Sequence, residues 1–223
     1  MTALSGVSFS IHAGEVLGLI GPNGSGKTTL FECLGGVLPM DDGGIEQGAR
    51  RLTSSERAEL LFYLPDAIAP WPQQTVRWAL DFTIGFFQGR ADLRDELVRG
   101  LTLGPLLAAR IGALSKGERK RVALAIGLLT PQPVLLSDEP FDGLDLRQSR
   151  DVARLLRSET ATGRAVVLSI HQISDAARVC DRFVLLSNGR VCGEGTFQEL
   201  AAVAEARSGE RPANLDEVFL ALT

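Results

Sequence analysis

The sequence predicts a single α/β domain over residues 1–223, built on a mostly parallel sheet. Short apolar runs of strand length recur at residues 16–20, 60–64, 134–137, 165–170 and 183–187. Helical patterns fill most of the intervals, an alternation typical of a parallel sheet with helices on both faces. Residues from about 70 to 130 show successive helical patterns instead, which indicates a helical subdomain inserted into the core.

Composition excludes several classes of protein. The net charge of −4 argues against a general nucleic-acid-binding surface, so no nucleic-acid partner is expected. No apolar run approaches the roughly 20 residues that span a bilayer, and residues 5–12 alternate like a strand rather than a signal segment. The three cysteines lack metal-ligand spacing and are interpreted as buried free thiols in a reducing cytosol.

The N-terminal part of the chain is expected to be antiparallel β structure. Residues 4–11 predict a strand, Ala13 and Gly14 a turn, and residues 15–20 the next strand. Residues 27–35 predict a helix, because the glycine pair that follows is a common helix end. A turn-rich stretch at 40–48 follows, with Ile45 expected on an edge strand.

The middle of the chain changes from strand to helix. A short polar helix is expected from Ser54, and the strand at 60–64 ends at a proline. The Pro-rich stretch at 69–72 breaks regular structure, and the apolar spacing is helical from Thr75 onward. Phe82, Phe86 and Phe87 form an aromatic stripe, which we interpret as helix-packing core, with a partner-facing surface as the alternative.

The C-terminal part returns to alternating strands and helices. Helices are predicted at 147–160 and 173–179, and a last pair from Thr196 and from Asn214. Asn-Gly at 188–189 is a hairpin signature between strands at 183–187 and 190–193. Thr196 and Glu199 have the spacing of a capping box.

A phosphate-binding loop follows the strand at 16–20. Residues 21–28 match G-x-x-x-x-G-K-[ST], and the motif lies between a strand and a helix, as its chemistry requires. Glycines let successive backbone N–H groups point at phosphate oxygens, and the helix N-terminus adds positive potential. Lys27 is expected to reach the β- and γ-phosphates, and Thr28 to ligate Mg²⁺. The candidate loop residues are Gly21, Pro22, Asn23, Gly24, Ser25, Gly26, Lys27, Thr28 and Thr29.

A pair of carboxylates follows the apolar strand at 134–137. Parallel sheets bind ligands at the carboxyl ends of their strands, which is where Asp138 and Glu139 lie. Asp138 is expected to hold Mg²⁺, and Glu139 to orient and polarise an attacking water. A polar strand end alone would be weak evidence, but downstream of a phosphate loop it predicts hydrolysis of a bound nucleotide.

The stretch at 114–122 opens another helix. Ser115 as N-cap and Glu118 three residues later form a capping box, so local structure alone explains both. Gly117 costs up to about 1 kcal/mol of helix propensity relative to Ala, and a phosphate approaching this N-terminus would explain its presence. The basic residues at 116–121 are interpreted as a solvated helix flank rather than a nucleic-acid patch.

The order of these motifs resembles the nucleotide-binding subunit of an ABC transporter over essentially the whole chain. The resemblance implies the ABC type of P-loop NTPase fold, with ATP and Mg²⁺ as cofactors. It also implies a head-to-tail homodimer or heterodimer, in which Ser115, Gly117 and Glu118 of one subunit face ATP on the other. By the same resemblance, Asp145 belongs to a loop that communicates across the dimer, and His171 contacts the γ-phosphate.

The resemblance further implies an integral membrane permease as partner and a cytoplasmic position on the inner face of the membrane. Residues 214–223 resemble the short helix that ends many exporter-type subunits, so export is expected. A low-turnover regulatory subunit and a non-transport ABC ATPase are the alternatives. Retention of Glu139 and His171 argues against the first. The second class usually has tandem domains, coiled-coil inserts or basic linkers, which this sequence lacks.

Three positions depart from the family pattern. Asp66 stands where the family usually has Gln, and its carboxylate could ligate the metal while adding negative charge beside the phosphates. Low basal activity is therefore expected, with the groove around Asp66 receiving a permease helix. The signature reads Leu-Ser-Lys-Gly-Glu rather than Leu-Ser-Gly-Gly-Gln. The aromatic that stacks on adenine in the family would lie upstream of residue 1, so weaker ATP binding or a substitute residue is expected.

Overall fold

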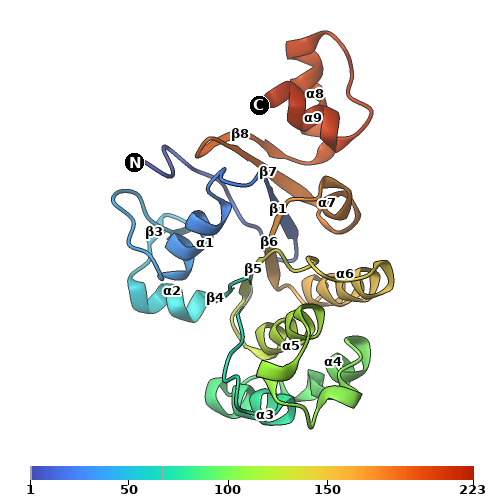
Figure 1. Cartoon of the computed structure of the whole chain (residues 1–223). Coiled ribbons are helices and arrows are strands. Elements are labelled where there is room, and N and C mark those ends of the chain that lie inside the picture. The colour runs from blue at the N-terminus through green and yellow to red at the C-terminus, as the bar shows by residue number, and fades with distance from the viewer. Residues whose placement is uncertain (1, 67) are drawn as a thin grey trace.

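The computed structural model describes residues 2–66 and 68–223, and its centre is a twisted sheet in the order β4-β5-β6-β1-β7-β8 (Figure 1). The strands are β1 Val16–Ile20, β4 Leu61–Leu64, β5 Val134–Asp138, β6 Ala165–Ile170, β7 Arg182–Ser187 and β8 Arg190–Gly195. Neighbouring strands from β4 to β7 are parallel, and β8 runs antiparallel to β7. The predicted α/β class with a mostly parallel sheet is therefore confirmed.

Helices cover both faces of this sheet, which explains why its central strands are continuous apolar runs. The helices outside the middle of the chain are α1 Lys27–Gly35, α2 Ser54–Leu60, α6 Leu146–Thr160, α7 Ile173–Val179, α8 Phe197–Ser208 and α9 Leu215–Leu222. Side chains of β1 alternate between the two sides: Leu17 and Leu19 pack with α1, whereas Val16 and Ile20 pack into the larger core on the other face.

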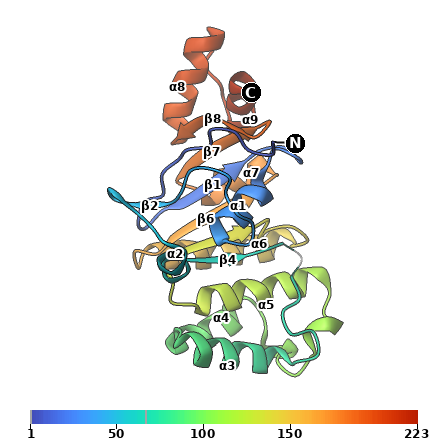
Figure 2. The same cartoon turned by 90° about the vertical axis from the view of Figure 1, so that its left-hand side faces the viewer.

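Between β4 and β5 the described chain is helical. It contains α3 Val76–Phe87, α4 Arg94–Gly100 and α5 Lys116–Leu129, with short 3₁₀ turns at Ala91–Leu93, Gly104–Leu106 and Ile111–Ala113. These helices gather at one end of the molecule, and α8 and α9 lie at the opposite end (Figure 2). The three main helices pack against one another, since α3 and α4 both contact α5.

The prediction of a strand at residues 4–11 is wrong. The segment is extended but has no ladder of backbone pairs, and it is tied to the β7–β8 turn by Ser5 N–H donating to Gly189 O at 2.8 Å. Val7, Phe9 and Ile11 still pack against the core beside α1. The alternating pattern therefore reports one-sided burial without a paired strand. The small antiparallel sheet lies instead at β2 Glu46–Gln47 and β3 Arg50–Arg51.

The aromatic stripe of α3 divides between core and surface. Phe87 packs edge-on against Phe62 of β4, with ring centroids 5.6 Å apart. Phe82 and Phe86 face outward, with 37% and 68% of their surface exposed. The interpretation as core is therefore wrong for these two, and the alternative of a partner-facing surface stays a prediction for them.

Candidate functional site

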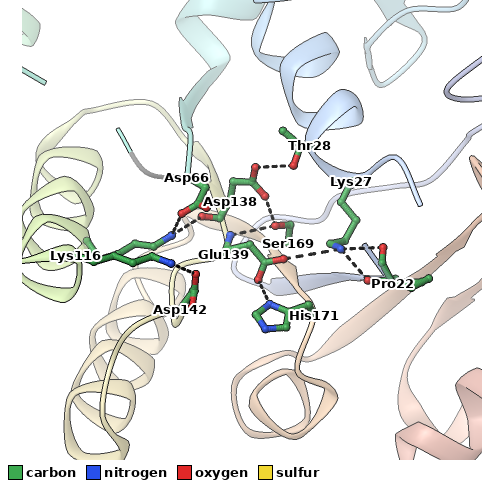
Figure 3. Close-up of polar contacts among 12 residues, drawn as sticks. Pro22, Lys27, Thr28, Asp66, Lys116, Asp138, Glu139, Asp142, Ser169 and His171 are labelled. Atoms are coloured by element: carbon green, nitrogen blue, oxygen red, sulfur yellow. Dashed lines mark hydrogen bonds and ion pairs between the residues drawn. The ribbon is translucent and has the colours of Figure 1, made fainter. Parts of the chain in front are cut away.

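The predicted site residues meet at the carboxyl ends of three neighbouring strands. The phosphate loop follows β1, Asp138 and Glu139 lie at the end of β5, and His171 follows β6 directly. Because β5, β6 and β1 are adjacent and parallel, their ends share one edge of the sheet (Figure 3). This edge is where parallel sheets bind ligands.

The phosphate loop has the backbone shape that an anion site requires. Gly26 adopts the left-handed conformation, with φ of 105°, immediately before α1. No side chain of the described residues caps α1, so the N–H groups of its first turn remain available to an anion. The Ser25 hydroxyl is buried without a hydrogen-bond partner among the described residues. Together these groups form a set of donors that fits phosphate oxygens.

Lys27 is folded into the loop rather than extended into solvent. Its Nζ donates to the carbonyls of Gly21 at 2.7 Å and Pro22 at 3.3 Å, and lies 3.8 Å from the Glu139 carboxylate. Burial lowers the pKa of Lys27, and the negative charges of Glu139 and Asp138 partly offset that effect. A phosphate in the loop would supply the anionic partner that these carbonyls replace.

Asp138 is buried and both of its carboxylate oxygens are occupied by hydroxyl donors. Thr28 Oγ1 donates to one oxygen at 3.0 Å, and Ser169 Oγ donates to the other. Ser169 also accepts the backbone N–H of Glu139 at 3.0 Å. We did not predict a role for Ser169, although a serine inside the otherwise apolar run at 165–170 was the available signal.

Glu139 lies between a cation and an imidazole. Its second carboxylate oxygen is 2.6 Å from His171 Nδ1, opposite the oxygen that faces Lys27. The Glu139 backbone has φ of 48°, a conformation that non-glycine residues rarely adopt and that clusters at functional sites. The strand end and the imidazole therefore fix the direction of the carboxylate, which can polarise a water.

The start of α5 has a structural explanation for its signature residues. Ser115 and Glu118 form the predicted capping box, with Ser115 N–H donating to Glu118 at 2.8 Å. A Cβ on Gly117 would stand 2.7 Å from the Gly143 carbonyl, so this position requires glycine for close packing. Asp145, in the same loop, caps α6 by accepting the Gln148 N–H at 2.9 Å.

Asp66 contacts Lys120, one of the basic residues at 116–121. Its carboxylate pairs with Lys120 Nζ, which also donates to the Asp138 carbonyl at 3.3 Å. Lys116, one turn earlier, pairs with Asp142 at 2.5 Å. The interpretation of residues 116–121 as a solvated flank is therefore wrong for Lys120, whose side chain is only 9% exposed, and for Arg121, which is buried and donates to the Leu101 carbonyl at 2.6 Å.

A strand, phosphate loop and helix, with a carboxylate pair on the next strand but one, define the class of P-loop nucleoside triphosphatases. The sequence profile of the ABC transporter family matches residues 4–142, and the chain belongs to this family. It is thus an ABC transporter ATPase, and ATP binding is implied by the family.

Relatives and solved structures agree with this assignment. The chain is 35% identical over 211 residues to a hemin import ATP-binding protein of Thermobifida fusca, covering 89% of this chain and 73% of the relative. It is 33% identical over 205 residues to a lipopolysaccharide export system ATP-binding protein of Acidithiobacillus ferridurans, covering 87% and 84%. A solved structure of an ATP binding subunit of an ABC transporter superposes with a TM-score of 0.87 at 28% identity, covering 99% of this chain and 92% of that one. These relatives serve both import and export.

Proposed function

We propose that this chain is the ATP-hydrolysing subunit of an ABC exporter, bound to a separate integral membrane permease on the cytoplasmic face of the membrane. The observation that supports this most is the convergence of the phosphate loop, Asp138, Glu139 and His171. The loop amides and Lys27 would bind the phosphates. Glu139 would hold and polarise the attacking water, while His171 orients Glu139 and stabilises charge on the γ-phosphate.

Mg²⁺ fits the oxygen donors at the end of β5. The Thr28 hydroxyl and the Asp138 carboxylate already lie 3.0 Å apart, and Mg²⁺ prefers such oxygens together with substrate phosphates. The ion would neutralise charge that develops on the transferred phosphoryl group. Asp66 is a third candidate ligand, and its pairing with Lys120 would have to loosen for that role.

A head-to-tail dimer, of two identical or two different subunits, would complete the site. The start of α5, with Ser115, Gly117 and Glu118, would face ATP held by the partner's phosphate loop. Ser115 is exposed, and it lies at an N-terminus where backbone N–H groups and the helix dipole favour an anion. The contact of Gly117 with the Gly143 carbonyl would link this helix start to Asp145 on the same loop.

An exposed aromatic surface offers a place for the permease. It consists of Trp71, Trp78, Phe82 and Phe86, whose rings contact in series with centroids 4.8–5.7 Å apart. Contiguous exposed aromatics of this size mark interaction sites. A hollow of about 100 Å³ also lies between α5 and the segment after β4, lined by Pro65, Ile68, Lys116, Arg119, Lys120 and Ala123. A permease helix would lie across this end of the molecule.

Export, rather than import, is supported by helix α9. Helix α9 begins after Asn214, which caps it, and packs against α8. This short terminal helix is the feature that resembles exporter-type subunits. Within the described residues no helix is both long and apolar enough to cross a bilayer.

Reconstitution tests this function directly. The chain would be purified alone and then combined in liposomes with a candidate permease, chosen from membrane proteins encoded in its gene neighbourhood. We expect ATP hydrolysis to rise when this permease is present, and substrate to move away from the side on which the chain and ATP are supplied. An absence of both binding and stimulation would contradict the transport function, and substrate movement toward that side would contradict export.

A further inference from the structure

One buried lysine joins three parts of the chain that are far apart in sequence. Lys120 lies on α5, Asp66 follows β4, and the Asp138 carbonyl ends β5. Lys120 Nζ contacts the Asp66 carboxylate and donates to the Asp138 carbonyl at 3.3 Å. The Lys120 side chain is 9% exposed and the Asp66 side chain 36%, so the cationic end of this pair is shielded from solvent while its carboxylate is partly exposed.

This ion pair is linked through Asp138 to the phosphate loop. Asp138 contacts Thr28 of the phosphate loop through its carboxylate and Lys120 through its carbonyl. A carboxylate near this point would repel ATP unless a cation compensates its charge. Lys120 supplies that cation, and Asp66 gives the lysine the acidic partner that a buried ammonium requires.

We propose that Lys120 is a positioning residue, which holds Asp66 in place and neutralises it toward bound ATP. The proposal rests on the proposed nucleotide site. Through Lys120, the segment after β4, the signature helix α5 and the end of β5 are held together. Lys120 also lines the hollow beside Pro65 and Ile68, so a partner seated there would touch the ion pair itself.

The pair Lys116–Asp142 differs in a way that makes Lys120 the informative residue. Lys116 is 55% exposed, and its bond to Asp142 raises the lysine pKa and lowers the aspartate pKa. It joins α5 to the loop after β5, but among the described residues Lys116 makes no hydrogen bond or ion pair with Asp138. Water can replace much of the exposed Lys116–Asp142 ion pair. Lys120, in contrast, contacts Asp138, a residue of the proposed nucleotide site.

A double-substitution cycle tests the proposal by ATP affinity, measured by calorimetry first in EDTA and then with Mg²⁺. Lys120→Met keeps the apolar stem and removes the charge, so Lys120 no longer compensates the negative charge of Asp66. We expect ATP to bind about threefold to tenfold more weakly, with a larger loss in EDTA, because Mg²⁺ partly neutralises the phosphates. Adding Asp66→Asn should restore affinity to about the wild-type value, and Lys120→Arg should retain it.

The control is Arg94→Met, which breaks an ion pair of 2.8 Å with Asp81 between α4 and α3 and should leave ATP affinity unchanged. Equal affinities for Lys120→Met and the double variant would overturn the proposal, as would wild-type affinity for Lys120→Met. If Lys120→Met does not fold, Lys120→Gln enters the same cycle. A wild-type chain that binds no ATP would contradict the nucleotide site instead, so the two failures are distinguishable.

Discussion

At the scale of single residues, the Glu139 carboxylate is held from two sides. It lies 2.6 Å from His171 and 3.8 Å from Lys27, and the Glu139 backbone has positive φ. Glu139→Gln keeps shape and hydrogen bonding but removes the charge that polarises water. We therefore expect ATP binding to persist while hydrolysis falls about 100-fold or more.

The measurement for Glu139→Gln is single-turnover hydrolysis beside equilibrium ATP binding, with size analysis to detect ATP-bound dimers that accumulate. Turnover within a few-fold of the unsubstituted chain would show that Glu139 is not the catalytic carboxylate. Loss of ATP binding as well would point to a folding defect, which the melting temperature of the variant would reveal.

Asp66 shows what the sequence could and could not predict about individual residues. Its place after the strand at 61–64 is visible in the sequence, and so is its departure from the family amide. Its partner is 54 residues away on α5, and only packing reveals that contact. Ser169 is similar, because its hydrogen bond to Asp138 exists only where strands β5 and β6 are neighbours. The charge of a residue can be predicted from sequence, but the residue that neutralises it in the fold cannot.

At the scale of elements, α5 combines local and tertiary reasons for the same residues. The capping box of Ser115 and Glu118 was predictable because it involves residues three apart. The requirement for Gly117 was not, since it comes from the Gly143 carbonyl across the loop after β5. The strand prediction for residues 4–11 is wrong for a related reason. A segment that is buried on one side shows the same alternating pattern as a strand, even when no neighbouring strand pairs with the segment.

Two substitutions of Ser115 separate capping from ATP contact. Ser115→Ala removes the cap, at a cost of about 1 kcal/mol in stability, and adds no bulk. Ser115→Arg also places bulk and charge where the partner's γ-phosphate would dock. In a Glu139→Gln background, we expect ATP-dependent dimers to persist with alanine and to disappear with arginine, as measured by light scattering. If both variants dimerise equally, only the capping role of Ser115 is supported.

At the scale of the whole molecule, the proposed nucleotide site and the exposed aromatic surface lie in different regions. The proposed nucleotide site lies at the carboxyl ends of β1, β5 and β6, while α3, which carries most of the aromatic surface, lies at the helical end beyond β4 (Figures 1 and 2). Helix α5 and the segment after β4 connect the two regions, and Lys120 bonds them together. A permease docked on the helical end would therefore act on the site through these two elements.

The last prediction concerns this end of the molecule. Trp78 and Phe86 lie on α3, with 38% and 68% of their surface exposed, and neither lies at the phosphate loop. Replacing both with Arg would put two cations on the surface that a permease helix must cover without water. We expect the isolated chain to keep its ATP affinity and basal hydrolysis, whereas permease binding falls at least about tenfold, because buried aromatic anchors dominate such interfaces.

Leu220→Arg is the matched control, since Leu220 is 76% exposed on α9 at the opposite end. Binding would be measured with the reconstituted permease in liposomes, and equal binding of the α3 and α9 variants would contradict this docking surface.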